Sequence, residues 1–220
     1  MSLKKPIAEI STGLFCFSPV NNFKTKSTKT KMPDYFDNIH FDAESFAALK
    51  SEGSFEFVEC HFNGVDFDRH NLGRMKFLDC HMSECNLSNQ SAKSSTFRDV
   101  SFTKSKLIGM NWSEASTFSS IAFSECILDY SVFHSMNLKG IKFSACRMCE
   151  VDFYESELIN ADFSDCLLKG ATFNKASLHG ADFRGAREYY IDVRQTNVKK
   201  AKFSLPEALS LLSSLEIIVE

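Results

Sequence analysis

Large apolar residues recur at every fifth position through most of the chain. From Phe57 the series runs to Trp112, and after one extra residue within 113–117 it continues from Phe118 to Phe203. A period of five matches neither the two-residue alternation of a β-strand nor the 3.6-residue period of an α-helix. A repeat this short predicts a coiled solenoid in which each five-residue unit forms one side of a turn.

The same residue types also recur every twenty positions. The clearest core column expected from this second period is Phe123, Phe143, Phe163, Phe183 and Phe203. Four units per turn would stack such a set with one member per turn, at the strand spacing of about 4.8 Å. Roughly thirty units then predict seven to eight turns and a rod about 35 Å long. Glu188 stands where an apolar residue is due, and Tyr189 and Tyr190 are placed to compensate.

The repeats follow a recognisable consensus. Ala161, Asp162 and Phe163 are a small, an acidic and a large apolar residue, followed by two variable positions, and residues 181–183 repeat this order. On these residues the chain resembles the pentapeptide-repeat family, over about residues 54–204. The resemblance implies an all-β solenoid, the right-handed quadrilateral β-helix of that family.

The chain divides by pattern into four parts. We expect a basic leader at 1–32, an N-terminal cap with irregular first repeats at 33–53, the β-helix at 54–204, and a C-terminal helix and tail at 205–220. The leader lacks periodicity, and its Asn, Ser, Thr and Lys favour disorder. A targeting or interaction arm is the alternative, supported by its positive charge. Met32 also fits a natural start, which would make the preceding residues an extension.

The last residues predict an α-helix from Pro206 to Leu215, followed by a short extended tail. Proline suits the first turn of a helix, where its missing N–H costs little. The helix is needed to cap the open end of the solenoid, but it is more apolar than one covered face requires. We therefore expect it to form a two-fold homodimer as well. The residues expected at this interface are Leu209, Leu212, Leu215, Ile217 and Val219.

Charge is unevenly distributed along the chain. Residues 1–32 contain six Lys and one Glu, while residues 33–220 contain nineteen basic and twenty-seven acidic residues. An acidic body argues against direct binding of nucleic acid, which requires clustered Lys and Arg, and leaves room for a basic partner. A run of acids without intervening cations is the candidate partner-binding site, with a solvated surface as the alternative. This acidic band spans less than one turn, so it encircles the rod, and it consists of Glu150, Asp152, Glu155, Glu157, Asp162 and Asp165.

The sequence offers no convincing catalytic or metal-binding motif. Six of the eight cysteines occupy the small inward position of the repeat, which indicates buried free thiols in a reducing cytoplasm. A disulfide between cysteines stacked on adjacent turns is the alternative. Cys146 and Cys149 form a lone C-x-x-C without partner ligands, and His61 and His81 lie one turn apart facing outward. Regular walls leave no loop long enough for a substrate cleft. We therefore expect a non-enzymatic protein without cofactor or metal, and no apolar run approaches the roughly 20 residues of a membrane span.

The ending LLSSLEIIV, with its leucine pair, polar turn and aliphatic tail, is similar to that of Qnr-like quinolone-resistance proteins. This resemblance implies head-to-head dimers whose acidic rods imitate duplex DNA and bind DNA gyrase or topoisomerase IV, with protection from quinolones. The projecting loops common in those proteins are missing here, and lysines and arginines flank the acidic band. The main alternative is a protein-interaction scaffold whose partner is unrelated to DNA topology, and a structural spacer comes after it.

Overall fold

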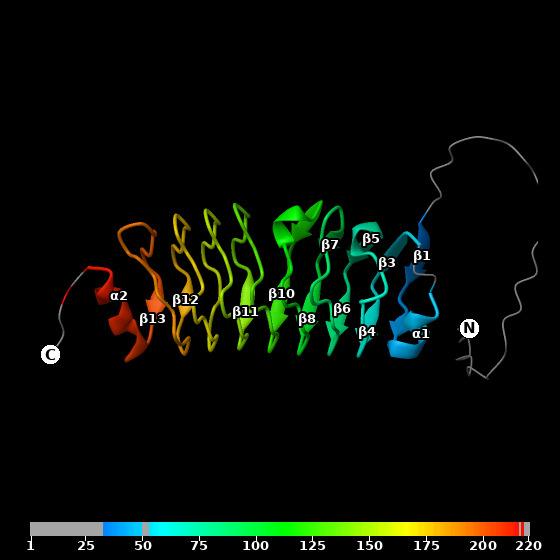
Figure 1. The fold of residues 1–220 in the computed structure, drawn as a ribbon, viewed down its shortest axis with the longest axis horizontal. Coiled ribbons are helices and arrows are strands. Elements are labelled where there is room, and N and C mark those ends of the chain that lie inside the picture. Colours follow the sequence, from blue (N-terminus) through cyan, green and yellow to red (C-terminus); the bar gives the residue numbers. More distant parts are fainter. Residues whose placement is uncertain (1–32, 50–52, 216, 218–220) are drawn as a thin grey trace, which may run out of the picture. The chain divides into compact units, whose positions relative to one another are not determined.

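The computed structural model describes residues 33–49, 53–215 and 217, which form a parallel β-solenoid of about eight turns with a short C-terminal helix (Figure 1). Strands pair in parallel with partners twenty or twenty-one residues away, one turn along the coil. The predicted fold class, an all-β solenoid with a C-terminal helical element, is confirmed. The leader expected at 1–32 lies outside the described residues.

The strands are short because each fills one side of a turn. They are β1 (Asp34–Asp37), β2 (His40–Phe41), β3 (Phe55–Val58), β4 (His61–Asn63), β5 (Met75–Leu78), β6 (His81–Ser83), β7 (Thr96–Arg98), β8 (Ser101–Thr103), β9 (Thr117–Ser119), β10 (Ala122–Ser124), β11 (Lys142–Ser144), β12 (Asp182–Phe183) and β13 (Lys202–Phe203). The helices are α1 (Ala43–Ala47) and α2 (Ser210–Ser213), with 3₁₀ turns η1 (Leu72–Arg74), η2 (Trp112–Glu114) and η3 (Glu207–Leu209).

Stacking of the turns creates four outer walls. Wall A is the sheet β1-β3-β5-β7-β9, and the bridge ladder over 137–197 continues it. Wall B is the sheet of β2, β4, β6, β8, β10 and β11, which single bridges extend to β12 and β13. Wall C is a ladder of single bridges over 66–187, and wall D is a similar ladder over 111–172.

Aromatic columns fill the core with one ring per turn. Phe123, Phe143, Phe163 and Phe183 are buried, and neighbouring rings are nearly parallel with centroids 4.8–5.3 Å apart. The ring of Phe203 stacks on Phe183 at 5.2 Å, but this last side chain of the column is only partly buried. Since adjacent strands have nearly the same spacing, in-register pairing places identical rings at a favourable stacking distance.

The corners between walls require residues with positive φ. At most corners the second position after a large inward residue supplies them, with φ of 54° at Asp79 and 69° at Gly140. The left-handed conformation costs an L-residue roughly 1–2 kcal/mol, a cost that Gly avoids and that Asn and Asp reduce through local hydrogen bonds. A position that looks freely variable in the sequence is therefore constrained by the backbone.

One extra residue enters the coil near η2, where the sequence predicts a shift of the repeat. Pairings that cross this point span twenty-one residues, as between Thr96 and Thr117, and later pairings return to twenty. At the other irregularity, Glu188 is exposed with φ of 55°. Tyr189 takes the inward place and is buried, whereas Tyr190 is exposed and adds nothing to the core.

The C-terminal helix is shorter than the span predicted from Pro206 to Leu215. It consists of the 3₁₀ turn η3 and the single α-turn α2, so the expectation of one continuous α-helix is wrong. Neither turn begins with a side-chain cap. The Ser214 hydroxyl donates to the Leu211 carbonyl and accepts from the Val193 N–H, which ties the end of the helix to the last turn. Within the described part of the chain, no helix has the length and apolar character needed to cross a membrane.

Candidate protein-interaction surfaces

The acidic band goes round a single turn of the solenoid. Three of its residues are at bridge positions on different walls: Asp152 on wall D, Glu157 on wall A and Asp162 on wall B. The other three are positive-φ corner residues, namely Glu150, Glu155 and Asp165. The structure thus distributes the six carboxylates over three walls and three corners, and no single flat partner surface can contact all of them.

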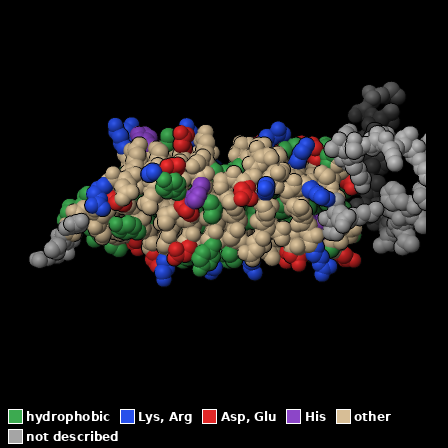
Figure 2. All heavy atoms as spheres, turned by 45° about the horizontal axis from the view of Figure 1, so that its top comes forward, with side chains coloured by type: hydrophobic (Ala, Val, Ile, Leu, Met, Phe, Trp, Pro, Cys, Tyr) green, Lys and Arg blue, Asp and Glu red, His purple; other side chains and the backbone are tan. Residues whose placement is uncertain are grey.

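Basic residues from neighbouring turns partner half of the band. The pairs, with their N···O distances, are Asp152–His134 (2.5 Å), Glu157–Lys139 (2.7 Å) and Glu155–Lys175 (3.3 Å). Ion pairs as exposed as these contribute about 0–1 kcal/mol to stability, but they reduce the charge that a partner would meet. Figure 2 likewise shows acidic and basic side chains interspersed over the visible face.

Hydrogen bonds favour the ionised form of two of the paired carboxylates. Burial by itself raises the pKa of Asp152, but hydrogen bonds with His134 and Thr172 outweigh it, so the pKa is lowered. Hydrogen bonds to the Tyr154 and Lys175 side chains lower the pKa of Glu155. Both groups remain charged at neutral pH, with their charges directed at neighbours on the same molecule.

A row of carboxylates runs along the corner between walls A and B. Glu59, Asp79 and Asp99 occupy equivalent positive-φ positions on consecutive turns, and all three are exposed. These three residues are called the acidic row, in which adjacent positions are about 4.8 Å apart at strand spacing. Its members are not neighbours in the sequence, because they are twenty residues apart. They become visible in the sequence only when charged positions are compared at the twenty-residue period. Arg98 Nε lies 3.6 Å from Asp99 at one end.

Three imidazoles stack beside the acidic row on wall B. The rings of His40 and His61 are nearly parallel with centroids 4.6 Å apart, and those of His61 and His81 are 5.0 Å apart. These residues are called the histidine ladder, and His81 Nδ1 lies 2.6 Å from the Ser101 hydroxyl. Burial and the two neighbouring imidazoles lower the pKa of His61. The sequence did not single out His40, because its pairing spans twenty-one residues rather than twenty.

The inward cysteines are suited to packing rather than to chemistry. Their thiols donate to backbone carbonyls, as Cys80 Sγ does to the Leu78 oxygen at 3.3 Å. Burial raises the pKa of Cys85 to about 11, so this thiol is neutral and unreactive at physiological pH. Over the residues that the structure describes, no three His, Cys, Asp or Glu side chains are grouped so that they could hold a metal ion.

An apolar surface surrounds the C-terminal helix. Leu209, Leu215 and Ile217 are exposed to 46%, 43% and 51%, and Leu212 is partly buried. Leu205 is exposed to 76% and was not among the residues expected here. The C-terminal apolar surface is defined as these five residues, while Val219, which was also expected at an interface, lies outside the described residues.

Fold and surface together define a class of protein, a parallel β-solenoid repeat protein with charged walls. The sequence profile described as "Pentapeptide repeat region" matches residues 55–133 and 117–183. The chain belongs to this pentapeptide-repeat family.

Two solved structures illustrate the likeness. A trypsin-treated variant of QnrB1, described as a plasmid-mediated fluoroquinolone resistance protein, has a TM-score of 0.57 and 14% identity over 86% of this chain and 98% of that chain. HetL, a pentapeptide-repeat protein involved in heterocyst differentiation regulation in the cyanobacterium Nostoc sp. strain PCC 7120, has a TM-score of 0.29 and 15% identity over 76% and 84%. At these identities the likeness to QnrB1 shows a shared fold. Comparison with curated protein sequences found no match.

Proposed function

We propose that this chain is a non-enzymatic, cytoplasmic protein-interaction module, and that its partner is DNA gyrase or topoisomerase IV, bound by imitation of duplex DNA. The observation that carries the proposal is the acidic row, which presents Glu59, Asp79 and Asp99 in a line along a regular solenoid. Proteins that contact the DNA backbone recognise lines of fixed negative charge. The chain shares its fold with a fluoroquinolone resistance protein, and protection of gyrase from quinolones is the expected consequence of the proposed binding.

The charge distribution favours imitation of duplex DNA by the N-terminal half of the solenoid. Residues 33–125 contain eight basic and fourteen acidic residues, a balance of −6, whereas residues 126–220 contain eleven and thirteen, a balance of −2. The first segment forms roughly four to five turns, or about 20 Å of axis, over which duplex DNA carries about twelve charges. This half offers about half the charge of DNA, so we propose a local contact at the acidic row rather than along an entire wall.

The acidic band has a secondary role in this proposal. Its corner residues Glu150 and Asp165 form no ion pair within the described ranges and are free to meet a basic partner. The other members either pair with cations of the same chain or bond to the neighbouring backbone, as Asp162 does with the Ser164 N–H at 2.9 Å. Their contribution to binding is therefore smaller than that of the row.

We further propose that two solenoids join through the C-terminal apolar surface. The last inward residues, Val198 and Phe203, are only partly buried although the helix lies over this end. Leu209 of the helix is exposed, and Leu211 and Leu212 are only partly buried. A second copy placed against this surface would remove these side chains from water at about 25 cal/mol per Å².

A supercoiling assay tests the proposed partner. Purified chain is added to DNA gyrase, relaxed plasmid and ATP, with and without a quinolone. Inhibition of supercoiling, or restored supercoiling in the presence of the drug, is expected at micromolar concentration. If supercoiling and drug inhibition are both unaffected at that concentration, the gyrase proposal fails.

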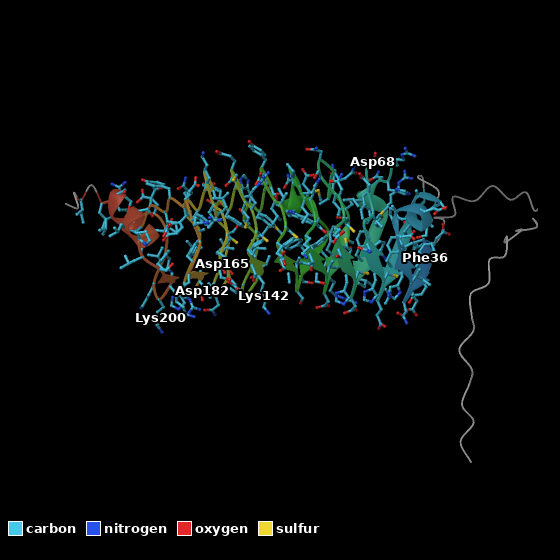
Figure 3. The ribbon with its side chains drawn as sticks, turned by 90° about the horizontal axis from the view of Figure 1, so that it is seen from below. Phe36, Asp68, Lys142, Asp165, Asp182 and Lys200 are labelled. Atoms are coloured by element: carbon cyan, nitrogen blue, oxygen red, sulfur yellow. The ribbon has the colours of Figure 1, made fainter. Side chains whose placement is uncertain are left out.

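A scaffold for a partner unrelated to DNA topology is the second candidate. It is favoured by the mixed charge of wall B in the C-terminal half, where Lys142, Asp162, Asp182 and Lys202 succeed one another on adjacent turns. Figure 3 labels Lys142, Asp182 and Lys200 along one edge of this half. Such mixed charge resembles the polar part of an ordinary protein interface more than it resembles DNA. Absence of binding to both DNA gyrase and topoisomerase IV would favour this candidate.

A further inference from the structure

A hollow of about 320 Å³ lies between α1 and the residues that follow β4. Ala43 and Ala47 form its apolar side. The polar side is formed by Asp66, Asp68, Arg69 and His70. Asp66 begins the bridge ladder of wall C, so the hollow is distinct from the acidic row between walls A and B. Asp68 stands at the outer edge of the N-terminal half (Figure 3).

His70 lines this hollow and is a buried polar residue. It occupies the inward position two residues before Leu72, is 5% exposed, and packs against the Phe46 ring with centroids 4.6 Å apart. Neither of its ring nitrogens has a hydrogen-bond partner among the described residues. Buried polar groups are nearly always satisfied, so an occupant that donates a hydrogen bond to this imidazole would be stabilised by it.

The carboxylates of the hollow are arranged to receive a cation. The two oxygens of Asp66 accept hydrogen bonds from the Asp68 N–H and from Asn86 Nδ2, each at 3.0 Å, which holds this carboxylate in place. Asp68 forms no ion pair in the part of the chain that the structure describes. Two carboxylates and one guanidinium, that of Arg69, line the hollow, so the rim has an excess of negative charge at neutral pH.

We propose that this hollow binds a lysine side chain presented by the protein partner. The aliphatic stem lies against Ala43 and Ala47, in the way that long basic side chains cover apolar surface. The ammonium meets Asp66 and Asp68, and the imidazole of His70, unpartnered among the described residues, supplies a third acceptor. The inference rests on the proposed role in binding a protein and names the chemistry of one contact.

The chemistry of the acceptors favours lysine over arginine. An ammonium has three N–H donors on a compact charge, which matches two carboxylates and one imidazole nitrogen. A guanidinium gains most from a carboxylate whose two oxygens are both available for a bidentate contact. Both oxygens of Asp66 already accept hydrogen bonds from the chain itself, so the point-like ammonium is the better fit.

A titration of the full-length, ¹⁵N-labelled chain with Nα-acetyl-lysine N-methylamide tests this inference by NMR. We expect saturable shifts of the amides of Ala43, Ala47 and residues 66–70, and of the ring nitrogens of His70, in the millimolar range that suits a single side chain. Nα-acetyl-norleucine N-methylamide has the same stem without the charge and should cause no saturable shift. Asp68→Asn should weaken binding of the lysine probe by at least about tenfold, as expected for loss of a charge-assisted hydrogen bond.

Asp79→Asn is the matched control, because it removes one exposed carboxylate from the acidic row and leaves the hollow unchanged. The inference is overturned if the lysine probe causes no saturable shift, if the norleucine probe binds equally well, or if the two Asp→Asn variants lose the same affinity. The probe reports on the hollow alone, so its failure is distinguishable from failure of the gyrase proposal, which the supercoiling assay measures.

Discussion

At the scale of single residues, the solenoid is stabilised by the stacking of identical side chains from consecutive turns. The ring of Phe143 lies between those of Phe123 and Phe163, with both centroid separations 5.3 Å, and its side chain is fully buried. Its loss would open a cavity that the flanking turns cannot fill, because their backbones are held by hydrogen bonds on both sides. Phe203 has the same chemistry at the end of the column but is partly buried.

Phe143→Ala should therefore destabilise the folded chain by about 3–5 kcal/mol, the usual cost of removing a buried aromatic ring. Phe203→Ala should cost markedly less, because part of that side chain is already in contact with water. Urea unfolding followed by circular dichroism measures both values. Equal losses in the two variants, or a loss of only about 0.5 kcal/mol for Phe143→Ala, would contradict the burial of this column.

The histidine ladder should make stability depend on pH. The pKa of His61 in the folded chain is lowered, so between that value and the unfolded value of about 6.5 the unfolded state binds more protons. The stability associated with this group is complete above about pH 6.5 and is lost as pH falls below it. Unfolding measured from pH 7.5 to pH 5 should show this loss, and His61→Ser should reduce the slope. His179→Ser, outside the ladder, is the control; identical slopes in the wild type and His61→Ser would contradict the assignment.

At the scale of elements, a strict period allows much of the fold to be predicted. The period of five places the large residues inward, the period of twenty aligns the Phe123 column, and the shift at 113–117 corresponds to the twenty-one-residue pairings near η2. These features depend on local sequence order alone. Tyr189 replaces Glu188 inside because an aromatic ring one residue later still reaches the core.

Features that depend on contacts between turns were harder to predict. The acids of the band look unpaired in sequence, but Lys139 and Lys175 reach Glu157 and Glu155 from adjacent turns. The hydrogen bond from the Val193 N–H to the Ser214 hydroxyl, which joins the end of the helix to the last turn, is likewise not revealed by the helical pattern. The acidic row also follows the twenty-residue period, but the apolar positions alone do not reveal it.

The C-terminal helix provides the prediction at this scale. Leu209→Asp places a charge on an exposed leucine of the C-terminal apolar surface and should convert the proposed dimer into a monomer in analytical ultracentrifugation. Ser213→Asp adds the same charge to an exposed polar residue of α2 and should leave the mass of the dimer unchanged. An unchanged mass for Leu209→Asp, or a wild type that sediments as a monomer, would exclude dimerisation through this surface.

At the scale of the whole described body, the chain is a regular solenoid with an asymmetric charge. Acidic residues exceed basic ones mainly before residue 126, whereas the later turns are nearly balanced. Long-range attraction of a basic partner thus acts on the N-terminal turns, where the acidic row lies, and salt screens it over about 10 Å at 0.1 M. Association through the C-terminal apolar surface is driven by burial of apolar area, which depends little on salt. The two proposed interfaces should therefore differ in the salt dependence of their binding.

Equilibrium binding of the full-length chain to DNA gyrase, with linear duplex DNA as competitor, tests the central claim most directly. The account predicts micromolar or tighter binding that saturating DNA abolishes and that weakens as salt is raised. The triple variant Glu59→Gln, Asp79→Asn and Asp99→Asn should bind at least about tenfold more weakly. The band variant Glu150→Gln, Glu155→Gln and Asp165→Asn changes net charge equally and should lose less affinity. Absence of binding, or binding that neither DNA nor the row variant reduces, would contradict the account.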